Sequence, residues 1–457
     1  MVLKGVKWID LDHGLVDRSI FVDEEIYQQE LEQVFGRSWL FVGHESQIPN
    51  AGDFVTTTMG EEPVIVSRDK SGVVHAYLNS CRHRGNAVTR ANLGNCSSFM
   101  CSYHGWTYDS SGALISVPGY KELYHEDMIK GTRDDWGLIK VPRVESFHGL
   151  IFANWDETAP GLVEYLGEYG WFLEARVDPQ GHGSEVDAVV LKWTMNHNWK
   201  FAADNFVGDI YHTTITHKSA NLAGHRTRSL GGAQAPAEAE AMREGGRYTE
   251  AQSNPDAFRM ATKYGHGGGF TLRPADAPLY RGEVSEQMAT YLQQRRDAIE
   301  QRLGPNRARI IAFNAMFPNF SINSSAEQIH VWHPRGPQKT ESWIYFLFDK
   351  AAPEEVKRQL VWENSRHFGP AGMFEQDDAD NWILSTKAAT SAIARRHPLH
   401  YGMGLKDNNW LEPKEDLPLR RQGTWGETNQ LNFYRVWQDM MWAKSWDELR
   451  SQPFEPV

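Results

Sequence analysis

The chain has 457 residues, of which 40% are hydrophobic and 12% aromatic, and its formal net charge is −12. This length predicts more than one domain, most simply two, each with a substantial core, and the acidic balance argues against a nucleic-acid partner. No apolar run approaches the length of a membrane span, and residues 1–7 lack the apolar core of a signal peptide, so we expect a cytoplasmic protein.

The first predicted element is an amphipathic helix over residues 23–36. Its apolar side chains recur at helical spacing and share one face. They are Ile26, Tyr27, Leu31, Val34 and Phe35.

From residue 39 to about 155 the pattern changes to short apolar or alternating runs separated by turn residues. Pro63–Ser67 and Val73–Leu78 are typical of strands, and Asp69–Gly72 and Asp109–Gly112 are typical of hairpin turns. This region is predicted to be a compact all-β domain.

The rest of the chain mixes both patterns. Strands are predicted at Val189–Trp193, Gln328–Trp332 and Ser342–Phe348, and helices within Asn198–Thr216, Glu283–Leu303 and Asn432–Trp442. Residues 219–270 are polar and contain three glycine pairs or triplets, so we expect a long, partly mobile region that contains lid or binding loops.

The only cysteines are Cys81, Cys96 and Cys101, within a window of 21 residues. An odd, low count argues against a disulfide framework and favours metal binding. The spacing is Cys81-x-His83, then seventeen residues, then Cys101-x2-His104. Each short loop thus offers one thiolate and one imidazole.

A zinc site is the alternative interpretation of these four residues, but zinc motifs usually pair Cys with Cys and His with His. The alternation of Cys and His instead fits a Rieske 2Fe-2S cluster, in which two His replace two Cys on one iron. Cys96 is expected to be a small buried residue and not a ligand.

A second candidate metal site begins at Asp209 and continues through His212 to His217. On a helix Asp209 and His212 would share a face, whereas His212 and His217 are five apart, so the helix must distort or end between them. A carboxylate from the acidic segment 375–380 would complete a two-His, one-carboxylate triad, which leaves positions on iron open for dioxygen. An acidic run of this kind is otherwise typical of a solvated helix start.

Five motifs carry a resemblance to a known family over essentially the whole chain. They are Cys81–Gly85, Cys101–Trp106, Asp204-Asn205-Phe206 with Asp209-x2-His212-x4-His217, Trp332–Pro337 and Phe368–Gly372. The sequence resembles the large (alpha) subunits of bacterial Rieske non-heme iron aromatic-ring-hydroxylating dioxygenases, of the naphthalene and biphenyl dioxygenase group.

The resemblance implies an α+β fold in three segments. Residues 1–37 would form an N-terminal helical segment of the catalytic domain. Residues 38–158 would form an all-β Rieske domain of antiparallel sheets. Residues 159–457 would form the catalytic mononuclear iron domain, with a central antiparallel sheet packed by helices.

The resemblance also implies the metal ligands. Cys81, His83, Cys101 and His104 would hold the 2Fe-2S cluster, and His212, His217 and Asp378 the mononuclear iron, with Asp377 as the alternative carboxylate. Asp209 would bridge two subunits, because the matching carboxylate of the family joins a cluster histidine of one subunit to an iron histidine of its neighbour. It would bond His104 across the interface and His212 within the chain, and so orient the imidazole.

The residues implied at or near the substrate pocket are Asn205, Phe206, Thr213, Asn319, Phe368 and Phe374. Phe374 stands where naphthalene-type enzymes have a Trp, and the smaller ring implies more pocket volume. Because no Lys or Arg lies in the matched pocket motifs, an apolar and polycyclic aromatic hydrocarbon is favoured over a carboxylated substrate.

The implied activity is cis-dihydroxylation of an aromatic ring with dioxygen and two electrons from NAD(P)H. The implied partners are a small beta subunit, in an assembly of three alpha with three beta subunits, and ferredoxin and reductase as electron donors. Alternative interpretations are a Rieske monooxygenase or demethylase, a Rieske electron-transfer protein and a zinc-stabilised binding module.

Overall fold

The computed structural model describes residues 7–124, 133–222, 256–274, 285–324, 327–407, 410–412, 417 and 420–451. The chain separates into two compact units, a larger one of Met1–Val34 with Val163–Val457 and a smaller one of Phe35–Leu162. Among the described residues, no helix has the length and apolar character needed to cross a membrane.

Three antiparallel sheets build the smaller unit. The largest has the order β6-β5-β4-β7, and the other two have the orders β10-β9-β8 and β11-β12-β3. Their strands are β3 (Leu40–His44), β4 (Asp53–Met59), β5 (Glu62–Arg68), β6 (Val74–Leu78), β7 (Leu93–Asn95), β8 (Ser98–Met100), β9 (Thr107–Asp109), β10 (Leu114–Ser116), β11 (Arg143–Phe147) and β12 (Leu150–Asn154). The predicted antiparallel β character of this region is confirmed, with a short α-helix, α2 (Tyr120–Leu123), after β10.

Both predicted hairpin turns form, and they use the same chemistry. Asp69 Oδ1 accepts hydrogen bonds from the N–H groups of Ser71 and Val73, at 2.8 and 3.0 Å. Asp109 does the same two and four residues ahead, at 2.9 and 3.0 Å. The turns therefore follow from an aspartate that bonds its own backbone and a glycine three residues later.

One antiparallel sheet of eight strands forms the centre of the larger unit, in the order β13-β19-β18-β17-β16-β15-β14-β21. The strands are β13 (Ser184–Met195), β14 (Ala257–Ala261), β15 (Gly267–Leu272), β16 (Ile310–Met316), β17 (Phe320–Asn323), β18 (Gln328–Pro334), β19 (Thr340–Asp349) and β21 (Gln422–Gly423). A small sheet, β1-β2-β20, joins Ile9–Asp10, Leu15–Val16 and Leu399–His400.

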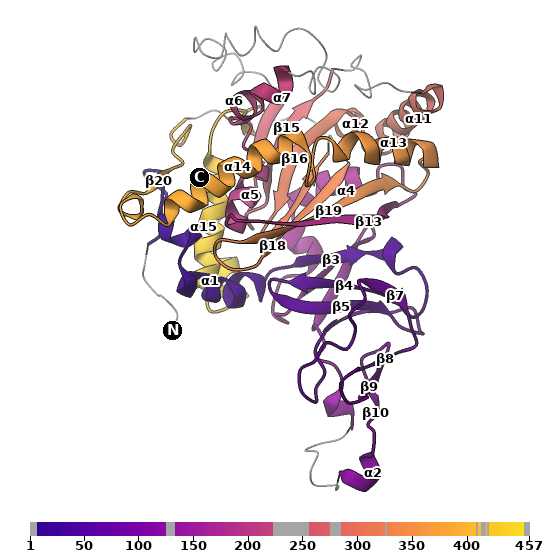
Figure 1. Ribbon diagram of the computed structural model, residues 1–457. Coiled ribbons are helices and arrows are strands. Elements are labelled where there is room, and N and C mark those ends of the chain that lie inside the picture. Colours follow the sequence, from indigo (N-terminus) through magenta and orange to yellow (C-terminus); the bar gives the residue numbers. More distant parts are fainter. Residues whose placement is uncertain are drawn as a thin grey trace. The chain divides into compact units, whose positions relative to one another are not determined.

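Helices cover this sheet, and in Figure 1 α13 and α14 are drawn across it. α5 packs on β16, β17 and β18, α14 packs on α5, and α15 packs on β14 and β15. Among the described residues, the α-helices of this unit are α1 (Glu24–Glu30), α3 (Leu162–Leu166), α4 (Glu168–Val177), α5 (Trp199–Phe206), α6 (Thr213–Thr216), α7 (Lys218–Leu222), α11 (Glu286–Leu303), α12 (Pro305–Arg309), α13 (Glu354–Ser365), α14 (Met373–Ala389), α15 (Thr428–Trp442) and α16 (Trp446–Ser451). An antiparallel sheet packed by helices, with the β-rich smaller unit, confirms the α+β fold class.

The predicted N-terminal helix ends in a π-helical turn, Leu31–Phe35. Glu30 is fully buried and forms an ion pair with Lys200 of α5. Its carboxylate also accepts hydrogen bonds from the indole N–H groups of Trp199 (3.1 Å) and Trp437 (2.7 Å). Three long-range partners therefore hold the helix against α5 and α15.

The expectation for residues 219–270 is corrected at its C-terminal end, where β14 and most of β15 lie. The glycine triplet Gly267–Gly269 is part of β15 and is buried. Residues 223–255 of that expected region lie outside the described residues. The glycine triplet predicted a loop, but in the structure it is part of a strand. Because these residues lack side chains, another segment of the chain can pack closely against the strand.

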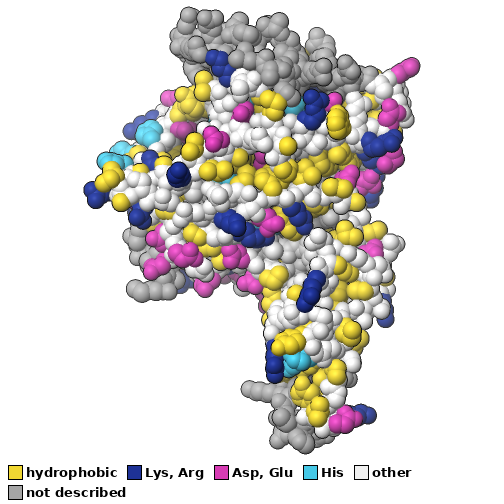
Figure 2. Space-filling model, in the orientation of Figure 1, with side chains coloured by type: hydrophobic (Ala, Val, Ile, Leu, Met, Phe, Trp, Pro, Cys, Tyr) yellow, Lys and Arg dark blue, Asp and Glu magenta, His cyan; other side chains and the backbone are white. Residues whose placement is uncertain are grey.

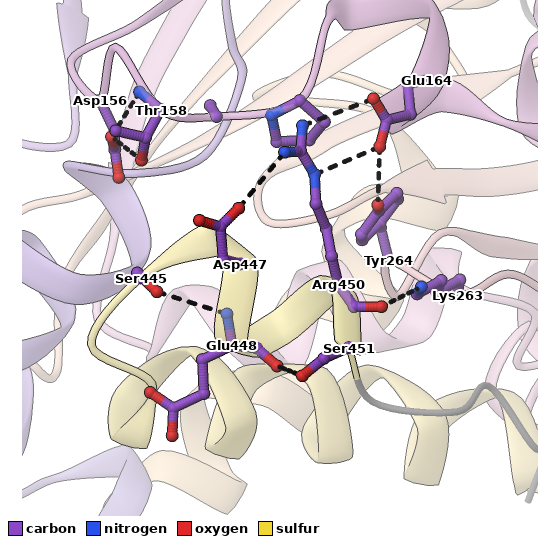
Figure 3. A network of polar contacts seen from close by, with 12 residues as sticks. Asp156, Thr158, Glu164, Lys263, Tyr264, Ser445, Asp447, Glu448, Arg450 and Ser451 are labelled. Atoms are coloured by element: carbon purple, nitrogen blue, oxygen red, sulfur yellow. Dashed lines mark hydrogen bonds and ion pairs between the residues drawn. The ribbon is translucent and has the colours of Figure 1, made fainter.

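At the C-terminal end, α16 is tied to the rest of the larger unit by Arg450 (Figure 3). Arg450 pairs with Glu164, with Nε 3.3 Å from Oε1, and its carbonyl accepts a hydrogen bond from Lys263 Nζ at 2.8 Å.

On the face drawn in Figure 2, basic and acidic side chains are interspersed between apolar ones.

Candidate metal centres

The two Cys/His loops of the smaller unit have the same backbone. In each, the cysteine N–H donates to the carbonyl five residues later, from Cys81 to Asn86 and from Cys101 to Trp106, both at 2.8 Å. In each, a glycine four residues after the cysteine donates back to the cysteine carbonyl and has a positive φ, +73° at Gly85 and +75° at Gly105. Glycine adopts this conformation without strain, so the sequence builds one loop twice.

The loops bring their histidines together. The rings of His83 and His104 are 4.4 Å apart, and His83 stacks on Trp106 at 5.2 Å. Among the described residues, buried His83 Nδ1 has no hydrogen-bond partner. Cys81 and Cys101 are buried and none of the three cysteines is in a disulfide.

Hydrogen-bond donors surround the two buried sulfurs. Tyr108 Oη lies 3.4 Å from Cys81 Sγ, and Asn86 Nδ2 lies 3.7 Å from Cys101 Sγ. Burial raises the pKa of Cys101, but the N–H of Tyr103 and the Asn86 amide outweigh it and leave that pKa below its ordinary value. Two thiolates and two imidazoles in this arrangement fit a 2Fe-2S cluster of the Rieske type.

Cys96 differs from the other two cysteines. It is partly buried and packs against the core of the smaller unit. Burial raises the pKa of its thiol, which favours the neutral form over a ligating thiolate.

The second site begins where α5 ends, at Phe206. Gly208 has φ +127°, and a Cβ there would lie 2.8 Å from the Gly268 carbonyl carbon of β15. A Cβ on Gly269 would in turn lie 2.6 Å from Ile210 Cδ1. Glycines on both sides let the segment that carries Asp209 pass close to the sheet, and the helix stops there.

The expectation that Asp209 and His212 share a helix face is therefore wrong. They lie in a turn, in which Asp209 Oδ1 accepts the backbone N–H of His212 at 3.1 Å. The single helical turn α6 (Thr213–Thr216) follows, and His217 comes directly after its last residue. This break allows two histidines that are five residues apart to face one point.

His212, His217 and Asp378 converge, with one donor atom from each within 4.8 Å of the others. Asp378 Oδ1 lies 3.4 Å from Nε2 of His212 and 3.4 Å from Nε2 of His217. Asp378 is 5% exposed and belongs to α14, far along the chain from the histidines. Two imidazoles and one carboxylate fit a ferrous iron with open positions.

The outer nitrogen of each histidine faces another carboxylate. Asp209 Oδ2 lies 3.3 Å from His212 Nδ1, and Asp377 Oδ2 lies 3.3 Å from His217 Nδ1. Burial lowers the pKa of His212, but Asp209 and then Asp378 raise it to about 9 overall. Carboxylates at Nδ1 hold each ring so that Nε2 faces the shared point.

The expected pocket residues divide into two groups. Phe374 lies 4.9 Å from the His217 ring and 5.7 Å from Phe368, and Asn205 Nδ2 lies 3.4 Å from His212 Nδ1. Phe206 packs on the same side of the sheet, 6.1 Å from Phe313.

The other two expected residues bond the backbone. Thr213 donates to the Ile210 carbonyl at 2.8 Å, and Asn319 donates to the Trp332 carbonyl at 3.2 Å. The sequence analysis missed two residues that contact the rings of Phe206 and Phe368. They are Phe313 on β16 and His330 on β18. The position of His330, two residues before Trp332 and thus on the same strand face, was the available signal.

Comparisons with known proteins follow the same division of the chain. The family model of the ring hydroxylating alpha subunit (catalytic domain) matches residues 177–443, and that of the Rieske [2Fe-2S] domain matches residues 38–133. Biphenyl 2,3-dioxygenase subunit alpha of Rhodococcus jostii (strain RHA1) is 38% identical to the chain over 459 residues, which cover 97% of this chain and 94% of that protein.

Two further proteins are similar to this chain over nearly its whole length. The large oxygenase component of the naphthalene 1,2-dioxygenase system of Pseudomonas aeruginosa is 37% identical over 444 residues, which cover 96% of this chain and 94% of that protein. The solved structure of a naphthalene 1,2-dioxygenase with indole bound in the active site aligns with a TM-score of 0.87 at 33% identity, covering 98% of this chain and 97% of that one.

Proposed function

This chain belongs to the aromatic-ring-hydroxylating dioxygenase alpha subunits, and we propose that it catalyses cis-dihydroxylation of an apolar, polycyclic aromatic hydrocarbon. The convergence of His212, His217 and Asp378 on one point carries the proposal. A protein that only transfers electrons has no need of this second site. The reaction joins one dioxygen molecule, two electrons and two protons to one ring.

We assign the metal ligands as follows. Cys81, His83, Cys101 and His104 hold the 2Fe-2S cluster, and His212, His217 and Asp378 hold the mononuclear iron. When bound, the cluster stores and passes single electrons and the iron activates dioxygen. Asp378 is preferred to Asp377 because its Oδ1 faces both Nε2 atoms, whereas Asp377 faces the outer nitrogen of His217.

Asp209 holds His212 in one orientation through two contacts, one to the ring and one to the backbone N–H. Burial raises the pKa of Asp209, but His212 outweighs it and the carboxylate stays ionised. We propose that Asp209 also bonds His104 of a neighbouring subunit. It would then join the imidazoles of the two centres and provide the electron route between them.

The substrate class is inferred from the rings beside the iron ligands. Phe206, Phe313, Phe368 and Phe374 are aromatic, and Phe374 lies directly against the His217 ring. These side chains exclude water and offer faces for a flat hydrocarbon. Relatives named for biphenyl, benzene and naphthalene support an apolar aromatic hydrocarbon as the substrate.

The proposed partners are a small beta subunit and an electron supply of ferredoxin and reductase that draws on NAD(P)H. Relatives that are named as alpha subunits support the first. We propose an assembly of three alpha and three beta subunits, because the Asp209 bridge requires a neighbouring alpha subunit.

The test is product analysis with the chain, its beta subunit and the electron donors. Hydrocarbons of two to four fused rings are supplied, together with benzoate as a carboxylated comparison. Cis-dihydrodiols from the hydrocarbons, with one NAD(P)H and one dioxygen consumed per product, are expected. Turnover of benzoate but of none of the hydrocarbons would contradict an apolar substrate. Hydroxylated products that include no cis-dihydrodiol would contradict cis-dihydroxylation.

A further inference from the structure

His330 is a buried polar residue on the sheet face that carries the expected pocket. It belongs to β18 and its side chain is fully buried. Its ring lies 5.0 Å from Phe206 and 6.0 Å from Phe368. Among the described residues, neither nitrogen of the ring has a hydrogen-bond partner.

Glu375 of α14 is a buried polar residue that approaches this ring. It is in the first turn of α14 and is 2% exposed. Its Oε2 lies 4.0 Å from His330 Nδ1, and its Oε1 has no hydrogen-bond partner within the described part of the chain. A hydrogen bond is only about 1 Å shorter, so a small shift of either side chain joins them.

The same helix turn carries Asp378, three residues after Glu375. Residues three apart on a helix share a face. A contact that fixes Glu375 against β18 therefore also fixes the rotation of the helix that presents Asp378.

Other contacts hold α14 farther along. Trp382 packs edge-on against Trp332 at 5.6 Å, and Thr386 Oγ1 accepts the Asn198 N–H at 3.0 Å. At the start of the helix, Gly372 gives no side-chain cap, and the N–H groups of Met373 and Phe374 donate to the carbonyls of Arg366 and His367. Within the described part of the chain, Glu375 is thus the polar side chain of the first turn that approaches the sheet, with its Oε2 4.0 Å from His330 Nδ1.

We propose that His330 is a positioning residue for the iron site, which acts through Glu375 to set the direction in which Asp378 faces His212 and His217. Each of these buried polar groups is costly as long as it lacks a hydrogen bond, so the arrangement of the helix in which the two side chains close the 4.0 Å separation is favoured. This inference rests on the proposed iron site and adds a residue that no ligand motif contains.

The test uses the enzyme with its cluster intact and its mononuclear iron removed by chelation. Ferrous iron affinity is measured by anaerobic titration calorimetry, and amide hydrogen exchange of the first turn of α14 is followed in the chelated protein. His330→Leu and Glu375→Leu are each expected to weaken iron affinity roughly ten-fold and to speed exchange at residues 375–378. The double variant is expected to be no weaker than either single variant, because both changes break one contact.

Two further variants separate positioning from loss of stability. His330→Gln keeps a side chain that can hydrogen-bond Glu375 and is expected to recover most of the affinity. His333→Leu removes a buried histidine three residues along the same strand, on its opposite face, and is expected to keep wild-type affinity.

Unchanged iron affinity in His330→Leu, or an equal loss in His333→Leu, would overturn the inference. His212→Ala tests the premise separately. If that variant bound ferrous iron as tightly as the wild type, the proposed iron site itself would be wrong, and the positioning role with it.

Discussion

Asp209 contacts His212 twice: its Oδ2 lies 3.3 Å from Nδ1 of the ring, and its Oδ1 accepts the backbone N–H at 3.1 Å. The two contacts fix the ring, so that Nε2 faces Asp378. They arise in a turn and not on a helix, because the chain leaves the helical path at Gly208.

Replacing Asp209 with Ala is expected to leave both metal centres largely intact when ferrous iron is supplied in excess, and to slow electron delivery. Stopped-flow absorbance, with substrate and dioxygen present, measures the rate at which the reduced cluster is oxidised. We expect this rate to fall roughly 10- to 100-fold. Asp187→Ala, an acidic side chain on β13, is the control and is expected to react like the wild type. A wild-type rate in Asp209→Ala would remove Asp209 from the electron route.

The two neighbouring aspartates of α14 are expected to behave differently. Asp378→Asn is expected to lower the iron content from about three to about two atoms per chain, because only the 2Fe-2S cluster remains. Asp377→Asn keeps the shared ligand position and is expected to retain most of its third iron. Iron and sulfide analysis decides between them, and the reverse pattern would make Asp377 the ligand.

Much of the fold was predictable because it follows from local chemistry. Asp69 and Asp109 bond their own turns, and the spacing of Ile26, Tyr27, Val34 and Phe35 places these side chains on the buried face of one helix. The likeness to the dioxygenase family was also visible in the sequence, since its motifs are long.

The features that could not be predicted from the sequence depend on contacts between distant segments. α5 ends at Phe206, and β15 lies against the chain at Gly208; the close approach explains why residues 267–269 of that strand are glycines. The pairing of His330 with Glu375 joins a strand to a helix 45 positions later, and neither residue belongs to a metal motif. Contacts of this kind can be recognised only once the tertiary structure is known.

Enlarging Phe374 is expected to narrow the pocket. Its ring lies against His217 and Phe368, so Phe374→Trp would place extra volume beside the iron ligands. We expect turnover of four-ring hydrocarbons to fall more than that of naphthalene, by a factor of about ten. Phe374→Leu is the matched variant and is expected to shift the preference the other way. An unchanged product profile across the panel in Phe374→Trp would remove Phe374 from the substrate pocket.

The N-terminal helix provides a stability prediction. Glu30→Ala leaves Lys200 as a buried charge without its partner and is expected to cost about 3–5 kcal/mol. The matched control is Glu164→Ala, which breaks a half-exposed pair with Arg450 and is expected to cost about 0–1 kcal/mol (Figure 3). Calorimetric unfolding compares the two, and equal losses would mean that Glu30 does not hold the helix. Glu30→Leu combined with Lys200→Met removes the unpaired charge and is expected to recover part of the loss, but it leaves the indole N–H groups of Trp199 and Trp437 without their acceptor.

We propose that both atoms of one dioxygen molecule enter one aromatic ring. Turnover of naphthalene under oxygen-18 gas, with the beta subunit and electron donors present, tests it by mass spectrometry of the product. We expect a cis-dihydrodiol in which both hydroxyl oxygens carry the label. A product with a single labelled oxygen would identify a monooxygenase and contradict cis-dihydroxylation.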